Sequence, residues 1–342
     1  MTRYLICNRT SSDSLTLMIE ALCSYSDYRI IHSLKEIDFE QGDLIVFAAD
    51  MNWMGDDPFI TRSVFEAFES IGLSGMQGAI LIASENEYFT KRYAQNLIFL
   101  LNQKGMTFCG HCLVESVRQF ENFKTWQKNY SLPLEEVCRL RIKEMHEHLN
   151  KKQTTGRKKI LVLHASQQET SNTLMLWEMV DRHLSAFERK VMHIENGNIV
   201  DCKGCDFTTC MHYSKANSCF YGGQVTNEIL PAIEWADIIV WVCPNYNDAV
   251  SAMHSALINR LTVLYRRISF FEKQIYGLIV SGNSGSDSVA CQLIGALTIN
   301  KGFELPPYSM LTAIANDPGS ILEVEGIESK ARDFAMNIIR NA

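Results

Sequence analysis

Short apolar runs alternate with amphipathic stretches along the second half of the chain. Residues 160–165 form an apolar run rich in branched side chains, and apolar residues recur at helical spacing over residues 171–186. The alternation continues with apolar runs at 190–194, 237–243 and 275–280 and amphipathic stretches near 224–235, 252–267, 286–301 and 325–340. Strands that are apolar nearly throughout and alternate with helices are typical of a parallel sheet covered on both faces. We therefore predict a five-stranded, doubly wound α/β domain whose fifth strand lies near residues 304–311.

The first half shows the same pattern in reduced form. It carries four strand-like runs, at 3–7, 28–31, 43–48 and 78–83, and helical stretches near 14–25, 61–70 and 90–104. The halves also match in sequence at one constant offset, where Ser84, Asn86, Gln95, Lys104 and Gly105 correspond to Ser281, Asn283, Gln292, Lys301 and Gly302. A repeat of this length predicts two copies of one α/β fold in tandem.

A polar and basic segment, residues 151–159, separates the two halves. It contains Gly156 and follows a helix-like stretch at 134–149, so it has the composition of a linker. The length of 342 residues also suits two domains better than one. We place the domains at residues 1–150 and 157–342.

Composition narrows the class of protein. Hydrophobic residues make up 46% of the chain and charged residues 21%, which is typical of a folded globular protein. The net charge of −7 has the wrong sign for coating nucleic acid phosphates. Apolar runs fall short of the roughly 20 residues that span a bilayer, and the N-terminus lacks the pattern of a secretory signal. We expect a cytoplasmic protein with no nucleic acid or membrane partner.

Polar loops follow three predicted strands of the second half, at the sheet edge where open α/β domains bind ligands. Residues 166–173 are rich in hydroxyl and amide side chains ahead of a helix, which favours a monophosphate, although Ser171 or Asn172 as a simple helix cap is the alternative. In residues 244–252, Tyr246 lies between amide side chains, which suits a planar heterocycle as well as an ordinary turn. Residues 281–286 carry Gly282 and Gly285, which allow a ligand to approach the backbone.

Together these loops resemble the flavodoxin-like NAD(P)H-dependent FMN reductase family. Residues 166–173 (SQQETSNT) stand where the family has an SPRxxSNT-type phosphate loop, and residues 244–247 (PNYN) match its P-x-Y-N-type flavin loop. The resemblance covers residues 159–342 and implies two tandem flavodoxin-like domains, the first of them degenerate. It implies that the FMN phosphate is held by Ser166, Gln168, Ser171, Asn172 and Thr173, and that the isoalloxazine is lined by Pro244, Asn245, Tyr246 and Asn247 and closed on its other edge by Ser281, Gly282 and Asn283.

Four cysteines lie in a long insert that the first half lacks. Cys202, Cys205, Cys210 and Cys219 follow a C-x2-C-x4-C-x8-C spacing. Four thiolates so close in sequence suit a [4Fe–4S] cluster or a zinc ion, and the remaining interpretation is free thiols in a loop beside the flavin. The cluster also resembles the compact cysteine motif of the iron–sulfur flavoproteins, a branch of the same family in which a cluster exchanges electrons with FMN.

The resemblance implies an FMN-dependent oxidoreductase that passes hydride or electrons from NAD(P)H to a small-molecule or protein acceptor. The flavin carries the chemistry, so we expect no catalytic acid or base from the protein. One alternative is an electron-transfer protein that binds FMN, with or without an iron–sulfur cluster, and does not itself react with nicotinamide. Another is an interaction protein without a cofactor. The resemblance also implies a homodimer.

Overall fold

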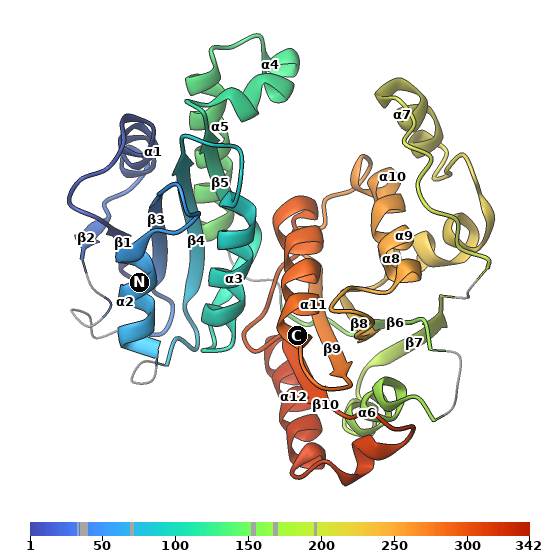
Figure 1. Cartoon of the computed structure of the whole chain (residues 1–342). Coiled ribbons are helices and arrows are strands. Elements are labelled where there is room, and N and C mark those ends of the chain that lie inside the picture. Colours follow the sequence, from blue (N-terminus) through green and yellow to red (C-terminus); the bar gives the residue numbers. More distant parts are fainter. Residues whose placement is uncertain (33, 35–39, 69–71, 152–154, 167–169, 195–196) are drawn as a thin grey trace. The chain divides into compact units, whose positions relative to one another are not determined.

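The computed structural model describes residues 1–342 except 33, 35–39, 69–71, 152–154, 167–169 and 195–196. Two compact units divide the chain, Met1–Lys152 and Gln153–Ala342 (Figure 1). Each unit is a parallel five-stranded sheet flanked by helices, which confirms the predicted fold class. Within the described residues, no helix is long and apolar enough to cross a membrane.

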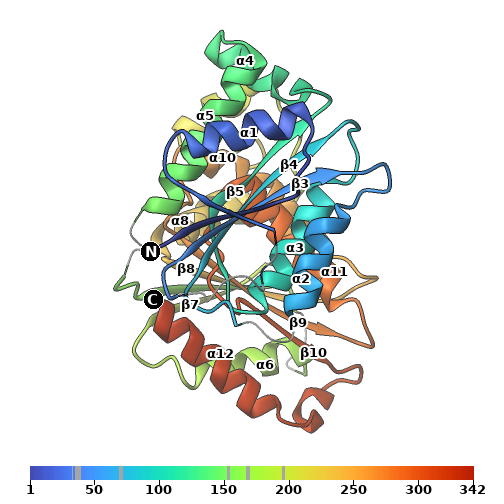
Figure 2. The ribbon, with the colours of Figure 1, turned by 90° about the vertical axis from the view of Figure 1, so that its left-hand side faces the viewer.

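The first unit has the strand order β2-β1-β3-β4-β5, with every neighbouring pair parallel. Its strands are β1 (Arg3–Cys7), β2 (Arg29–Ile31), β3 (Leu44–Met51), β4 (Gln77–Ser84) and β5 (Thr107–Val117). Its helices are α1 (Asp13–Cys23), α2 (Pro58–Phe68), α3 (Thr90–Asn102), α4 (Lys124–Tyr130) and α5 (Leu134–Asn150). Helices α1 and α5 cover one face of the sheet and α2 and α3 the other (Figure 2).

The first unit has a fifth strand, β5, that the sequence analysis did not predict. Its register against β4 shifts between Gly78 and Ile80, and His111 has a positive φ of 59°. This irregularity is a β-bulge, which interrupts the alternation of buried and exposed positions that would otherwise mark a strand. Cys109 and Cys112 are buried within β5. The first sheet is therefore as large as the second, and the prediction of a reduced copy is wrong in this respect.

The second unit has the strand order β7-β6-β8-β9-β10. Its strands are β6 (Lys159–His164), β7 (Glu188–His193), β8 (Ile238–Pro244), β9 (Gln274–Ser281) and β10 (Met310–Ile314). Its helices are α6 (Asn172–Asp181), α7 (Phe207–Lys215), α8 (Leu230–Trp235), α9 (Ala252–Arg260), α10 (Thr262–Tyr265), α11 (Ser286–Leu293) and α12 (Ile327–Asn341), and π-helical turns at Val225–Ile229 and Ile294–Ile299 adjoin α8 and α11. Numbered within each unit, both sheets have the order 2-1-3-4-5 of the flavodoxin-like fold.

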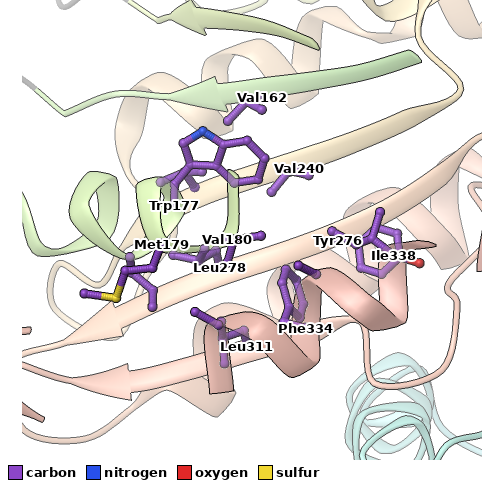
Figure 3. Close-up of a cluster of buried hydrophobic side chains, with 14 of the residues drawn as sticks. Val162, Trp177, Met179, Val180, Val240, Tyr276, Leu278, Leu311, Phe334 and Ile338 are labelled. Atoms are coloured by element: carbon purple, nitrogen blue, oxygen red, sulfur yellow. The ribbon is translucent and has the colours of Figure 1, made fainter. Parts of the chain in front are cut away.

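An apolar core fixes helices α6 and α12 against the second sheet (Figure 3). Helix α6 contributes Trp177, Met179 and Val180, and α12 contributes Phe334 and Ile338. The ring of Tyr276 on β9 meets Phe334 edge to face, with centroids 5.6 Å apart. Burial of these side chains anchors α6 along its length, so the helix N-terminus is held at a defined place beside the sheet edge.

A buried ion pair joins the start of the second unit to the segment before β10. Arg157 Nη2 donates to Glu304 Oε2 at 2.5 Å, and the two side chains are 3% and 8% exposed. Arg157 also donates to the carbonyl oxygens of Glu272 and Asn341, and Gln274 Nε2 donates to the other oxygen of Glu304. Burial raises the pKa of Glu304, although Arg157 opposes the shift.

Candidate functional site

The three loops singled out in the sequence meet at one edge of the second sheet. Strands β6, β8 and β9 are parallel neighbours and end at His164, Pro244 and Ser281. The backbone N–H of Asn245 donates to the carbonyl of Val280 at 2.9 Å, which ties the second loop to the third. A ligand at this edge is therefore within reach of all three loops, as expected for an open parallel sheet.

Three hydroxyl groups converge at the start of α6. Ser171 Oγ lies 2.9 Å from both Ser166 Oγ and Thr173 Oγ1, and Ser166 and Thr173 are themselves buried. Ser171 occupies the N-cap position, yet among the described residues its side chain caps no backbone N–H. The N–H groups of the first helical turn are thus left for another acceptor. Hydroxyl donors beside an uncapped helix N-terminus form an arrangement that suits a phosphate.

Two other residues, Gln168 and Asn172, were also expected to hold the phosphate. Gln168 lies outside the described residues. The Asn172 side chain donates to the carbonyl oxygens of Ala315 and Asp317, at 3.1 and 2.9 Å, and its oxygen accepts from the Ile321 N–H. These bonds tie α6 to the segment after β10. Asn172 therefore offers a ligand its backbone N–H rather than its side chain.

The second loop forms a tight turn that presents Tyr246 to solvent. Asn247 and Asp248 have positive φ values of 54° and 56°, and Tyr246 pairs with Ala249 across the turn. Two successive left-handed residues are typical of a type I′ turn. The ring of Tyr246 is 61% exposed, so it is free to stack on a planar ligand.

Asn245 connects this turn to the third loop. Its Nδ2 donates to Ser281 Oγ at 3.0 Å, to the Ser284 carbonyl at 2.9 Å and to Asp248 Oδ1 at 3.2 Å. Its Oδ1 is buried without a partner among the described residues. A buried acceptor left unpaired is costly, so this oxygen is a candidate contact for a ligand N–H. Asn283 is exposed, and its Oδ1 accepts from the N–H of the next residue.

The glycines of the third loop face protein atoms rather than open space. A Cβ on Gly285, whose φ is +81°, would lie 1.8 Å from Asp248 Oδ1. A Cβ on Gly282 would lie 2.8 Å from Asn316 Oδ1. A side chain at either position would therefore collide with Asp248 or Asn316, and the approach of a ligand to this backbone stays a prediction. The sequence analysis missed both residues, and only the Asn-Asp pair of the turn gave a signal for Asp248.

Three histidines gather at the end of strand β6. The rings of His164 and His193, at the ends of two paired strands, stack with centroids 4.9 Å apart. Burial, with the charge of His193, lowers the pKa of His164 to about 4, and His164 Nδ1 is buried with no partner in the described structure. Burial likewise lowers the pKa of His254 to about 4. Its Nδ1 lies 2.8 Å from Ser251 Oγ. Both imidazoles are therefore neutral at pH 7.

The four clustered cysteines do not form a metal site in the described structure. Cys202 is exposed, Cys205 and Cys210 are half-buried, and Cys219 is buried. Across the described ranges, no group of three or more His, Cys, Asp or Glu side chains is placed to hold a metal ion. A tetrahedral zinc or a [4Fe–4S] cluster needs four converging thiolates, so this arrangement fits neither group.

The cysteine insert packs against the segment that follows α10. Arg266 Nε lies 3.3 Å from Cys210 Sγ, and the Arg266 guanidinium stacks on Phe207. Arg266 follows α10, whereas α9 begins at Ala252 beside the Tyr246 turn. Whether these thiols lie beside a bound flavin stays a prediction.

At the matching edge of the first unit, two carboxylates accept hydrogen bonds from backbone N–H groups. Asp50 Oδ2 accepts from the Ser12 N–H at 2.5 Å, and Asp57 Oδ2 accepts from the Asp50 N–H at 2.7 Å. Asp57 Oδ1 also accepts from the N–H groups of Phe59 and Ile60, at the start of α2. Two backbone donors at the start of α1, the N–H groups of Ser12 and Leu15, are therefore paired within this unit.

Comparison with known proteins finds a similarity in the second unit. A family model described as NADPH-dependent FMN reductase matches residues 158–317. That range contains all three loops and strands β6 to β10. Among the curated proteins, none matches the chain.

Several solved structures are similar to about half of the chain. A structure of RosB with bound intermediate OHC-RP is 17% identical, with a TM-score of 0.41, and the match covers 54% of this chain and 78% of that one. An NAD(P)H:quinone oxidoreductase from Methanothermobacter marburgensis is 14% identical, with a TM-score of 0.39, over 54% and 100% of the two chains. The Trp repressor binding protein from Bacillus subtilis is 16% identical, with a TM-score of 0.36, over 52% and 99%. By its family match, the second unit is similar to the NADPH-dependent FMN reductases.

Proposed function

We propose that the second unit binds FMN without a covalent bond and acts as an NAD(P)H-dependent oxidoreductase toward an acceptor still to be identified. The observation that carries the proposal is the cluster of Ser166, Ser171 and Thr173 hydroxyls at the uncapped N-terminus of α6. The family match over residues 158–317 supports the choice of FMN among phosphate-bearing ligands.

The chain's own residues bind and orient the cofactor in this proposal. The three hydroxyls and the first N–H groups of α6 hold the phosphate, with the helix dipole favouring its negative charge. The exposed Tyr246 ring stacks on the isoalloxazine, and Asn245 holds the two flavin loops at a fixed spacing. Pro244, Asn247, Ser281, Gly282 and Asn283 complete the lining. FMN itself supplies the hydride and electron chemistry.

The proposal also covers the four cysteines, the first unit and the oligomeric state. We assign no step to an iron–sulfur cluster or zinc ion, because the described thiols do not converge. We assign no phosphate site to the first unit, where Asp50 accepts from the Ser12 N–H before α1. A homodimer, implied by the family resemblance, is tested by sedimentation of the FMN-loaded protein.

FMN titration of the purified chain, followed by quenching of flavin fluorescence, tests the binding step. Ser171→Ala removes the hydroxyl that contacts both others, and hydrogen bonds to charged groups contribute about 1.5–3 kcal/mol. We therefore expect FMN affinity to fall about tenfold to a hundredfold. The matched control is Ser12→Ala, which alters the N-cap of α1 in the first unit and should leave FMN affinity unchanged.

Anaerobic addition of NADPH or NADH to the FMN complex tests the reaction. Rapid bleaching of the flavin absorbance supports the oxidoreductase. Bound FMN that neither nicotinamide bleaches would support the electron-transfer protein instead. A chain that binds no FMN even at high concentration would refute both functions. It would support the remaining alternative, an interaction protein that has no cofactor.

A further inference from the structure

A groove opens between α2 and α3 of the first unit, beside the loop that follows β3. Its volume is about 450 Å³, within the range of roughly 300–1,000 Å³ of small-molecule sites. Most of its walls are apolar or aromatic. The lining residues are Met54, Gly55, Asp56, Thr61, Val64, Phe65, Phe89, Arg92, Tyr93, Asn96, Leu97 and Leu100.

The groove is a built feature rather than a loose gap between helices. Gly55 packs so closely on Phe89 that a Cβ at Gly55 would lie 2.4 Å from the ring atom Cγ. Phe89 itself has a φ of 73°, a left-handed conformation that is rare for a bulky residue. Such strain persists only where surrounding contacts hold it, and it clusters at ligand sites.

The groove has few polar groups, and hydrogen bonds link three of them on one part of its wall. Thr61 Oγ1 donates to Asp56 Oδ1 at 2.6 Å and lies 3.2 Å from the Tyr93 hydroxyl. Because the single Thr61 hydroxyl proton goes to Asp56, the Tyr93 O–H donates to Thr61 Oγ1, and the Tyr93 oxygen can accept a hydrogen bond from a ligand. Burial raises the pKa of Tyr93, so this hydroxyl stays protonated. Apolar walls with a few oriented polar groups are typical of sites for small organic molecules.

Large apolar side chains around the groove are exposed to solvent. Phe65 is 64% exposed, Met54 62% and Phe89 43%, and Trp53 beside them is 81% exposed. Scattered exposed apolar residues are ordinary, but a cluster around a cavity marks a binding surface. The loops after β3 and β4 that carry Met54 and Phe89 correspond in topology to the proposed flavin loops after β8 and β9.

The chemistry of the lining selects the class of ligand. Aromatic side chains such as Phe65, Phe89 and Tyr93 favour a planar aromatic body. The lining holds one carboxylate, Asp56, and one guanidinium, Arg92, so the charges balance and favour a neutral ligand. A phosphate is disfavoured because the lining carries a single guanidinium, which the Asp56 carboxylate offsets.

We propose that the groove between α2 and α3 binds a neutral, fused-ring aromatic molecule without a phosphate group. The site is separate from the proposed FMN site and does not depend on the proposed function. The first unit thus has a ligand site of its own beside the loops that follow β3 and β4.

Calorimetric titration with lumiflavin, a neutral tricyclic compound, tests the proposal. The full chain is first saturated with FMN, and no nicotinamide is added. We expect one further binding site per chain. Phe65→Ala removes an exposed aromatic wall and should weaken lumiflavin binding about tenfold. Asn96→Trp places an indole on the lining of α3 and should abolish it.

The control is Ile30→Ala, which removes an apolar side chain that is 51% exposed on β2 and does not line the groove. It should leave lumiflavin binding unchanged. Absence of a saturable second site would overturn the proposal. So would equal affinities in the unaltered chain, Phe65→Ala and Asn96→Trp, or an equal loss in Ile30→Ala. A chain that fails to bind FMN but binds lumiflavin in a Phe65-dependent way would refute the proposed function alone.

Discussion

Replacing Gly285 with alanine should damage the proposed flavin site through a single added atom. Gly285 has a φ of +81°, and its new Cβ would lie 1.8 Å from Asp248 Oδ1 and 3.1 Å from Asn245 Nδ2. Alanine resists this left-handed backbone, and the Asp248 carboxylate cannot stay where it is. Gly285→Ala therefore combines backbone strain with displacement of the turn that carries Tyr246.

The two effects can be given magnitudes. A left-handed conformation costs a residue with a Cβ roughly 1–2 kcal/mol. If the Asp248 carboxylate turns away, its hydrogen bond from Asn245 Nδ2 is lost, and hydrogen bonds to charged groups contribute about 1.5–3 kcal/mol. We expect Gly285→Ala to lower the free energy of unfolding by about 3 kcal/mol and to weaken FMN binding, because the turn is displaced.

Gly319→Ala separates the two effects. Gly319 has a φ of +82°, yet its added Cβ would have no neighbour within 4 Å, so this variant carries the backbone strain alone. Urea unfolding should show a loss of about 1–2 kcal/mol and FMN titration no change. The double variant Gly285→Ala with Asp248→Gly should be no less stable than Gly285→Ala alone, because the clash and the hydrogen bond disappear together. Equal losses in Gly285→Ala and Gly319→Ala would refute the reasoning.

Three other perturbations probe the second unit. Glu304→Gln leaves the Arg157 cation buried without its counter-charge, and urea unfolding should show a loss of about 3–5 kcal/mol. Asn172→Ala removes three hydrogen bonds to the segment after β10, and should cost about 1–3 kcal/mol in the same assay. The folded-state pKa values of His164 and His254 are about 4, below the ordinary 6.5, so below pH 6.5 the unfolded chain takes up protons that the folded chain does not. Stability should be full above about pH 6.5 and fall as the pH drops toward 4, and a urea midpoint at pH 5 equal to that at pH 7 would contradict this assignment.

The sequence predicts this architecture well because buried parallel strands have a recognisable sequence pattern. Strands β6, β8 and β9 are buried on both faces, so each appears as a continuous apolar run. Parallel order then brings the loops after them to one edge, which places Ser166, Asn245 and Ser281 near one another. The pairing of strands that lie far apart in the sequence follows from the topology of the fold. No local sequence pattern encodes it.

Other features depend on contacts that no local pattern encodes. Strand β5 contains a bulge at His111, which breaks the period of two on which strand prediction rests. Asn172 belongs to a loop that resembles a phosphate site, yet its side chain is used by the carbonyls of Ala315 and Asp317. The spacing of the four cysteines suggests convergence, but spacing along the chain does not determine whether thiols point toward a common centre.

The hydroxyl cluster of Ser166, Ser171 and Thr173 has a thermodynamic consequence on our proposal. A ligand stabilises the folded state that binds it by RT ln(1 + [L]/Kd). FMN held at this cluster would therefore raise the stability of the second unit. The supply of cofactor in a cell would then set how long that unit resists proteolysis.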